Sequence, residues 1–90
     1  MDQRRFVKIC NPEGLHARPC HAIVAIANRF ESSLEVRSGT QRVNGKSILQ
    51  LMTLAAGPGD ELELVSQGAD ADSLLSELIA LVEAGFGETS

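Results

Sequence analysis

The sequence predicts an α+β fold: an open-faced β-sandwich in which a four-stranded antiparallel sheet carries three helices on one face. Segments with strand character alternate apolar and charged residues, which is typical of antiparallel strands with one buried and one solvated face. Strand and helix signals follow one another in the order β-α-β-β-α-β-α. At 90 residues the chain has the length of one small domain, which we expect to span residues 1–90.

The first half of the chain is expected to form a strand, a helix and a hairpin. Within residues 5–10, Val7 and Ile9 fall on one face at a period of two, which predicts the first strand. Residues 17–30 repeat apolar side chains at helical spacing, which predicts an amphipathic helix. Residues 34–37 and 41–43 are short strand-like runs on either side of a glycine-containing turn, which predicts a hairpin.

The second half is expected to add a short helix, a strand and a last helix. Ser47 is a good N-cap for a helix over residues 48–54. Residues 60–65 alternate cleanly and predict the fourth strand. A leucine-rich helix follows and ends by Gly85, after which the tail beyond residue 86 is expected to be loose. Two residues could cap this last helix: Asp70 or Asp72.

Composition excludes several classes of function. Twelve acidic and eight basic residues give a net charge of -4, and the only aromatic residues are three phenylalanines, so we expect no nucleic-acid binding. No apolar run has membrane-spanning length, and no secretory signal precedes the first strand, so we expect a cytoplasmic protein without membrane insertion. The charged content of 22% argues against disorder.

The most informative segment is residues 14–19, Gly-Leu-His-Ala-Arg-Pro. Gly14 permits an unusual bend and Pro19 suits the first turn of a helix, so His16 should lie at or beside the N-cap. Backbone N–H groups at such a helix end bind anions, and the guanidinium of Arg18 can pair with phosphate oxygens. A nucleophilic imidazole at this place predicts a site that receives and passes on a phosphoryl group, whereas the alternative is a histidine that only caps the helix.

Ser47 and the short helix after it allow more than one interpretation. Residues 45–47 are similar to the end of a phosphate-binding P-loop, but Thr40 stands where that motif needs a glycine, so we reject this reading. Ser47 is either an ordinary N-cap or also a regulated phosphorylation site. The helix has more apolar residues than one face can bury, which predicts either an exposed docking patch or additional core packing. These residues are Ile48, Leu49, Leu51 and Met52.

The two cysteines are interpreted as small, partly buried apolar residues, because two cysteines make no disulfide framework in a cytosolic chain. We expect no metal and no cofactor. The alternative is a small metal or redox protein that uses Cys10, His16 and Cys20, although these spacings do not complete a zinc motif. His21 is expected to be a surface residue beside the site.

Residues 14–19 and 43–48 together resemble HPr, the histidine phosphocarrier family of the bacterial phosphotransferase system, and the similarity extends over nearly the whole chain. The resemblance implies that Enzyme I, charged by phosphoenolpyruvate, phosphorylates His16 on a ring nitrogen, and that His16 then donates to an EIIA protein or domain. Arg18 would steady the phosphate, and Ser47 matches the serine that HPr kinase/phosphorylase modifies in some members. The matching partner-docking residues are Ile48, Leu49 and Met52.

By this resemblance the chain is a stoichiometric carrier rather than an enzyme, and we expect a monomer. Two alternatives remain open: a nitrogen-type regulatory phosphocarrier, NPr, and a regulatory binding module controlled through Ser47. Ala25 and Asn28 replace lysines that many members carry on the first helix, and Cys20 and His21 stand where small residues are frequent. The docking surface is therefore expected to be less basic than usual.

Overall fold

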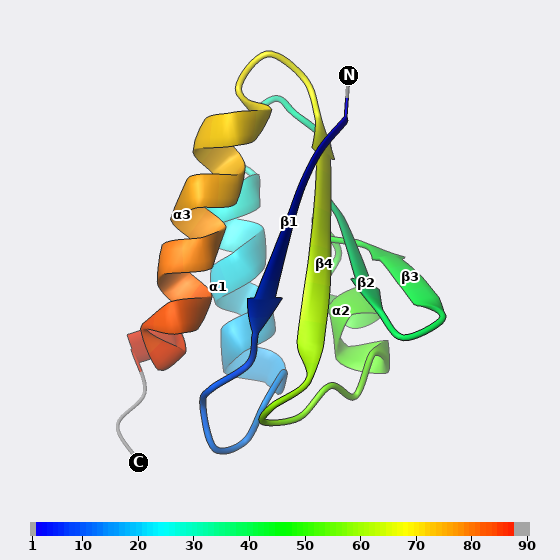
Figure 1. The fold of residues 1–90 in the computed structure, drawn as a ribbon, viewed down its shortest axis with the longest axis vertical. Helices are drawn as coiled ribbons and strands as arrows, with labels where there is room; N and C mark the ends of the chain where they lie inside the picture. The colour runs from blue at the N-terminus through cyan, green and yellow to red at the C-terminus, as the bar shows by residue number, and fades with distance from the viewer. Residues whose placement is uncertain (1, 88–90) are drawn as a thin grey trace.

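A computed structural model describes residues 2–87 and contains one open sheet with helices on one of its faces (Figure 1). The strands are β1 (Asp2–Lys8), β2 (Glu35–Ser38), β3 (Gln41–Asn44) and β4 (Glu61–Gln67). The helical elements are α1 (Ala17–Ala27), α2 (Ile48–Thr53), α3 (Ala71–Glu83) and the short 3-10 helix η1 (Gly85–Gly87). This order of elements confirms the predicted open-faced sandwich.

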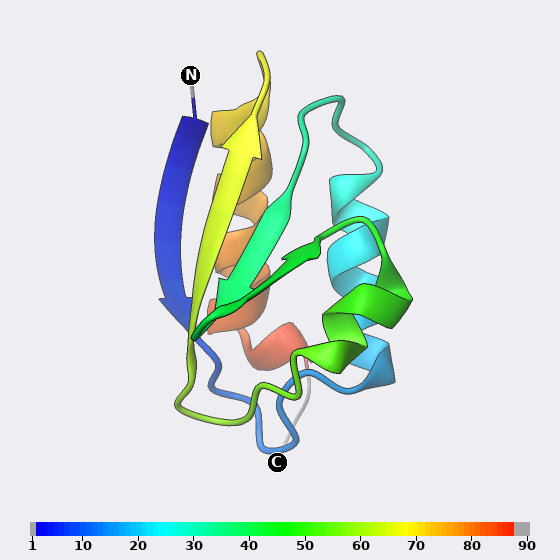
Figure 2. The same ribbon diagram turned by 90° about the vertical axis from the view of Figure 1, so that its right-hand side faces the viewer.

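The sheet has the order β1-β4-β2-β3, and every neighbouring pair is antiparallel. Its alternating side chains divide between two faces, as the strand pattern predicts. Those that point toward the helices are almost fully buried: Val7, Val36, Leu62 and Leu64. Seen from the side, the helices lie on that face and leave the other face of the sheet open (Figure 2).

The core lies between the sheet and the two long helices. Helix α1 contributes Ile23, helix α2 contributes Leu51, and α3 contributes Leu74, Leu75 and Leu78, each at most 2% exposed. Burying a side chain of this size stabilises the fold by roughly 1.5–3 kcal/mol. Helix α2 packs against α1 and β3, so the short helix is held in place although it is only six residues long.

Two predicted boundaries are wrong because partners distant in sequence decide them. The first strand was expected over residues 5–10 but spans Asp2–Lys8, the residues for which β4 provides partners. The first helix was expected over residues 17–30 but ends at Ala27, after which the Phe30 amide bonds to the Ala27 carbonyl at 3.2 Å in a tighter turn.

The remaining elements differ from prediction by one or two residues, within the usual uncertainty of element ends. Strand β2 is shifted by one residue to Glu35–Ser38, and β3 is one residue longer and ends at Asn44. The turn of the hairpin brings Ser38 opposite Gln41. The short helix ends at Thr53 rather than residue 54, and β4 continues to Gln67. The expectation of a loose tail concerns mainly residues 88–90, which lie outside the described residues.

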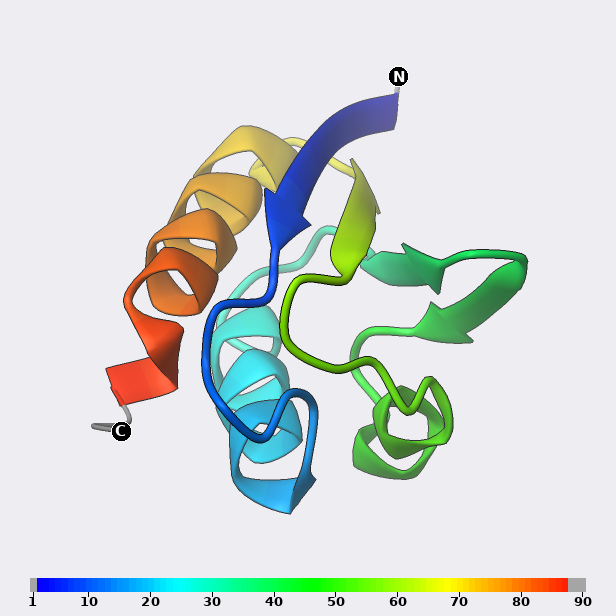
Figure 3. The same ribbon diagram turned by 60° about the horizontal axis from the view of Figure 1, so that its bottom comes forward.

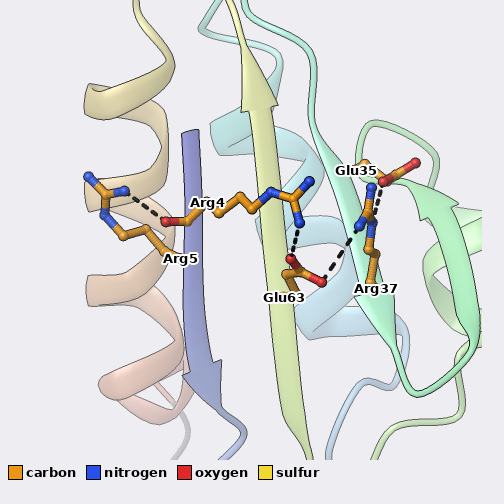
Figure 4. A network of polar contacts seen from close by, with 5 residues as sticks. All are labelled: Arg4, Arg5, Glu35, Arg37 and Glu63. Carbon is orange, nitrogen blue, oxygen red and sulfur yellow. Dashed lines mark hydrogen bonds and ion pairs between the residues drawn. The ribbon is translucent and has the colours of Figure 1, made fainter. Parts of the chain in front are cut away.

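The open face of the sheet carries a chain of ion pairs (Figure 4). The Glu63 carboxylate accepts from Arg4 at 3.0 Å and faces Arg37 Nη1 at 3.7 Å, and Arg37 Nε donates to Glu35 at 2.5 Å. The Arg5 guanidinium donates to the Arg4 carbonyl at 2.8 Å, on the side of β1 away from β4. This side chain therefore covers part of the edge of the sheet, which is otherwise a template for further strand pairing.

Asp70 lies at the N-cap position of α3, but the expectation that its side chain caps the helix is wrong. Its carboxylate instead accepts the backbone N–H groups of Glu31 and Ser32, both at 3.0 Å, and the Ser32 hydroxyl. The other candidate, Asp72, pairs with Arg5 at 2.7 Å. Asp70 thus ties the connection after α1 to the connection before α3.

The pKa of Asp70 is lowered, first by the hydrogen bond from the Ser32 hydroxyl and then by the backbone N–H of Glu31. A lowered folded-state pKa stabilises the fold above the ordinary aspartate pKa, and this contribution is lost as the pH falls through the folded value. Replacing Asp70 by asparagine is therefore expected to lower the free energy of unfolding at pH 7. The loss should shrink toward about pH 3, below the ordinary aspartate pKa of about 3.9.

Urea unfolding at both pH values measures this difference. The control is Asp72→Asn, which changes an exposed aspartate of the same helix and is expected to have the smaller effect at pH 7. A loss for Asp70→Asn that is equally large at low pH would contradict the assigned role of the carboxylate.

None of the helices within residues 2–87 combines the length and the apolar character that a membrane-spanning segment needs.

Candidate functional site

His16 is the N-cap residue of α1, as predicted, with an extended backbone at φ -92° and ψ -170°. Its carbonyl accepts the Cys20 N–H at 3.1 Å and so begins the helix. The imidazole makes no capping hydrogen bond, so the alternative in which the ring only caps the helix is not supported. The side chain is 35% exposed, which leaves the ring accessible at the surface.

The loop before His16 is positioned by a close approach to the segment after α2 (Figure 3). Gly14 has φ +67°, in the left-handed region that favours glycine. The Leu15 N–H donates to the Ala56 carbonyl at 2.9 Å, and the Leu15 side chain is buried in the core. A β-carbon on Gly14 would lie 2.3 Å from the Ala56 oxygen and 2.7 Å from Gly57 Cα. Glycine is therefore required here for both its conformation and its size.

Ala55 is a feature of this site that the sequence analysis missed. It has φ +51°, a left-handed conformation that costs an alanine about 1 kcal/mol. This turn ends the region of α2 and places the next residue, Ala56, against Leu15. Only the nearby Gly57 and the turn after it hinted at an irregular backbone, and no sequence signal marks Ala55 itself.

The start of α1 favours an anion. The first turn of α1 contains no acidic residue. The first amide to bond within the helix is that of Cys20, so the earlier N–H groups of Ala17 and Arg18 have no acceptor in the helix itself. Pro19 has no N–H, so the cradle has two amides rather than three. The Arg18 side chain is exposed and has no hydrogen bond or ion pair with the residues that the structure describes. Its guanidinium is thus available to pair with phosphate oxygens.

The second predicted group of residues lies on α2, next to α1 (Figure 3). The Ser47 hydroxyl accepts the Gln50 N–H at 3.2 Å, so the predicted N-cap is confirmed. Leu51 points inward and is fully buried. The other apolar side chains form an exposed or half-exposed surface, which we call the α2 apolar face, with Leu49 79% and Met52 42% exposed. Its residues are Ile48, Leu49 and Met52.

The two cysteines differ from the expectation that both are partly buried. Cys10 is exposed, and its thiol donates to the Val82 carbonyl at 3.3 Å. Cys20 is completely buried in α1, and this burial raises the pKa of its thiol. Among residues 2–87, no three His, Cys, Asp or Glu side chains lie close enough to hold a metal ion, so the alternative site of Cys10, His16 and Cys20 does not form.

The surface of α1 near His16 carries little fixed charge. His21, Ala25 and Asn28 are all exposed. Arg29, near the end of the helix, pairs with Glu77 of α3 and lies 5.6 Å from the Phe30 ring centroid. Arg18 is therefore the one arginine or lysine within α1 itself.

Comparison with known proteins gives a consistent result. A family model described as "PTS HPr component phosphorylation site" matches residues 3–84. The chain is 45% identical to a phosphocarrier protein HPr of Treponema pallidum over 93% of this chain and 96% of that protein. It is 37% identical to a phosphocarrier protein NPr of Shewanella violacea over 96% and 94% of the two chains.

The solved structures agree with the sequence matches. The structure of HPr-C-His from Thermoanaerobacter tengcongensis superimposes with a TM-score of 0.92 at 34% identity, covering 98% of this chain and 99% of that chain. A part of a multiphosphoryl transfer protein of Vibrio cholerae is also similar, at 37% identity over 90% of this chain and 21% of that protein.

Proposed function

The chain belongs to the HPr family of phosphocarrier proteins of the phosphotransferase system, and we propose that His16 is the residue that carries its phosphoryl group. A ring nitrogen attacks the phosphorus of a phosphorylated donor; the new P–N bond forms as the bond to the donor breaks, and the donor keeps the electron pair. The reverse exchange delivers the group to an acceptor. The observation that carries the proposal is the accessible imidazole at the N-terminus of α1.

Arg18 is proposed to steady the phosphoryl group on His16. Its guanidinium is two residues from the imidazole and has no partner within residues 2–87, so it can pair with two phosphate oxygens. The Ala17 and Arg18 amides add the positive end of the helix dipole. In this proposal these groups stabilise the phosphoryl dianion on His16, and no metal or cofactor takes part.

The proposed donor is Enzyme I charged by phosphoenolpyruvate, and the proposed acceptors are EIIA proteins or domains. The chain then acts as a stoichiometric carrier, which takes one phosphoryl group from the donor to the acceptor, and not as an enzyme. It works in the cytoplasm, where phosphoenolpyruvate is formed. The similarity to a segment of a multiphosphoryl transfer protein supports a place in such a relay. The covered edge of β1 supports a monomer, since Arg5 already occupies the Arg4 carbonyl.

Incubation of the purified chain with Enzyme I and phosphoenolpyruvate tests this function. One acid-labile, base-stable phosphate per chain is expected, and mass spectrometry under alkaline conditions should map it to His16. A parallel reaction without Enzyme I should give no incorporation. Phosphate on any other residue, or none at all, would overturn the proposal.

The α2 apolar face is proposed to be the surface on which donor and acceptor proteins dock. Substituting Leu49 by serine is expected to raise the KM for this chain in phosphorylation by Enzyme I by roughly 5- to 30-fold, the range for losing about 1–2 kcal/mol at an interface. The unfolding free energy should hardly change, because Leu49 is 79% exposed and contributes little to the core.

A matched control exists on the opposite side of the molecule. Phe6 is 60% exposed on the open face of the sheet, so Phe6→Ser also removes an exposed apolar side chain. It should leave the KM unchanged. If both variants raise KM equally, docking on the α2 apolar face is wrong.

A second proposed function is regulation through Ser47. Its hydroxyl caps α2 directly beside the α2 apolar face, so a phosphate there would sit at a helix start and add charge next to an apolar docking surface. Treatment with HPr kinase/phosphorylase and ATP should then place an acid-stable phosphate on Ser47 and slow phosphorylation of His16. A chain that this kinase leaves unmodified would not support the regulatory function.

The similarity to a protein named NPr keeps a nitrogen-type role as an alternative choice of partners. The chemistry at His16 would be the same. Rates of transfer from the phosphorylated chain to a sugar-type and to a nitrogen-type EIIA protein distinguish the two roles, and the faster acceptor identifies the system that the chain serves.

A further inference from the structure

We propose that a cleft beside the β2–β3 hairpin binds the phosphate group of a small phosphate ester, with Arg42 as its anchoring cation. The cleft has a volume of about 430 Å³ and is formed by residues of β2, β3, α2 and the segment before β2. None of the described residues that line it belongs to the site at His16 or to the α2 apolar face. Binding there does not depend on phosphoryl transfer at His16.

Arg42 carries an exposed positive charge that this part of the chain does not neutralise. It lies directly opposite Arg37 in the pairing of β2 with β3, and like charges at such positions repel each other. Arg37 donates to Glu35 at 2.5 Å and faces Glu63 at 3.7 Å (Figure 4). The Arg42 side chain, in contrast, makes no hydrogen bond or ion pair within residues 2–87. A bound anion would neutralise the Arg42 guanidinium and weaken its repulsion of Arg37.

Other side chains of the cleft have hydrogen-bond donors to spare. Asn44 Oδ1 accepts the Lys46 N–H and Gln50 Oε1 accepts the Asn44 N–H, both at 2.9 Å. These bonds orient the two amides, and neither NH2 group donates to an acceptor in the described part of the chain. The Ser33 hydroxyl accepts the Gln67 N–H at 3.3 Å and still has its own proton to donate. The donors of the cleft therefore come from β3, from α2 and from the segment before β2.

This set of donors suits a phosphate better than a carboxylate. A guanidinium pairs with two oxygens of either anion. A phosphate ester has a third strong acceptor oxygen, which the amides and the hydroxyl can bind, whereas a carboxylate has only two oxygens. Small-molecule sites commonly have volumes of about 300–1,000 Å³, so the cleft has room for a short organic part as well. Leu34 and Val43 provide apolar lining for that part.

The Glu35 carboxylate also lines the cleft, and its negative charge opposes an anion. Its bond from Arg37 Nε offsets this charge in part. Because Arg42, Asn44 and Gln50 are all exposed, the ligand also remains in contact with water. We therefore expect weak binding, with a dissociation constant on the order of 1 mM for glycerol 3-phosphate.

NMR titration of the nitrogen-15-labelled full chain with glycerol 3-phosphate tests this site. At about pH 7.5 the ester is mainly a dianion. At constant ionic strength, saturable shifts are expected for the backbone amides of residues 42–44 and for the side-chain NH2 groups of Asn44 and Gln50. The Ala17 and Arg18 amides give separate signals, so phosphate bound at the start of α1 is not mistaken for phosphate in the cleft.

Two comparison ligands define the chemical class. Glycerate has a carboxylate in place of the phosphate and should bind at least about threefold more weakly, as for the loss of one hydrogen bond. Glycerol has no charge and should cause no saturable shift in the cleft.

Three variants test the role of Arg42. Arg42→Gln should weaken binding about tenfold or more, the range for losing hydrogen bonds from a charged group. Arg42→Lys keeps the charge but not the planar pair of donors, so its loss should be intermediate. The matched control is Lys8→Gln, which removes an exposed cation from β1 and should leave the dissociation constant nearly unchanged. Since Arg42 is exposed and opposes Arg37, Arg42→Gln should unfold at no lower urea concentration than the wild type.

The absence of saturable shifts at residues 42–44 would overturn the site. So would an undiminished affinity in Arg42→Gln, an equal loss in Lys8→Gln, or glycerate that binds as tightly as the phosphate ester. None of these results bears on phosphate uptake by His16, which Enzyme I and phosphoenolpyruvate measure separately. Failure of this inference and failure of the proposed function are therefore distinguishable.

Discussion

Replacing His16 by alanine is expected to abolish the acid-labile phosphate that Enzyme I and phosphoenolpyruvate place on the chain. The P–N bond needs an imidazole nitrogen, and alanine offers none. Incorporation of radioactive phosphate, measured before and after acid treatment, reports the loss. The expected result is complete loss rather than a reduced rate, because the nucleophile itself is removed and not a group that assists it.

His21→Ala is the matched control for this prediction. His21 is an exposed histidine of the same helix, five residues after His16, and it should have no part in the transfer, so the variant should still take up one phosphate per chain. The His16→Ala chain should remain folded, with an unfolding free energy within about 1 kcal/mol of the wild type, since the imidazole makes no capping bond. Acid-labile phosphate that persists in His16→Ala would assign the carrier role to another residue.

Gly14→Ala is expected to be the most destabilising loop substitution in this site, lowering the free energy of unfolding by about 2–4 kcal/mol. Two costs add together. The left-handed φ of +67° is strained for alanine, and the new β-carbon would lie 2.3 Å from the Ala56 oxygen. That oxygen belongs to the backbone and accepts the Leu15 N–H, so it cannot move aside without breaking the contact that positions His16.

Gly39→Ala separates the two costs of this prediction. Gly39 also has a left-handed φ, of +59°, but a β-carbon there would meet no atom within 4 Å. It should lose only about 1 kcal/mol, from conformation alone. Urea unfolding of both variants measures the difference, and Gly14→Ala should in addition take up phosphate more slowly than Gly39→Ala. Equal losses in the two variants would show that the close approach of Gly14 to Ala56 has no energetic effect.

Much of the candidate site could be predicted because its signals are local. The run from Gly14 to Pro19 indicates a helix start, and the structure places His16 at the N-cap. Ser47 could be predicted as a cap from its residue type. The apolar residues of the short helix predicted either an exposed patch or additional core packing, and the structure shows that Leu49 and Met52 are exposed. The roles of His16, Arg18 and Ser47 in phosphoryl transfer and regulation stay predictions until the experiments above are done.

Other features of the site could not be predicted, because each depends on a partner that folding brings near. The sequence does not reveal that Ala55 adopts a left-handed conformation or that Ala56 receives the Leu15 amide. It also does not show that the Glu13 carboxylate lies 3.6 Å from His16 Nε2. No signal in the sequence predicted different burial for the two cysteines, yet Cys20 is fully buried and Cys10 is exposed.

The fold class, the order of elements, the single buried face of the sheet and the helix start at His16 could be predicted, because periodicity and capping act between residues close along the chain. In contrast, where β1 begins, where α1 ends and which groups Asp70 binds depend on tertiary contacts. The tertiary structure also decided how tightly the loop at Gly14 is held. These features follow from contacts between segments that are distant in sequence, and such contacts exist only once the sheet and helices have packed together.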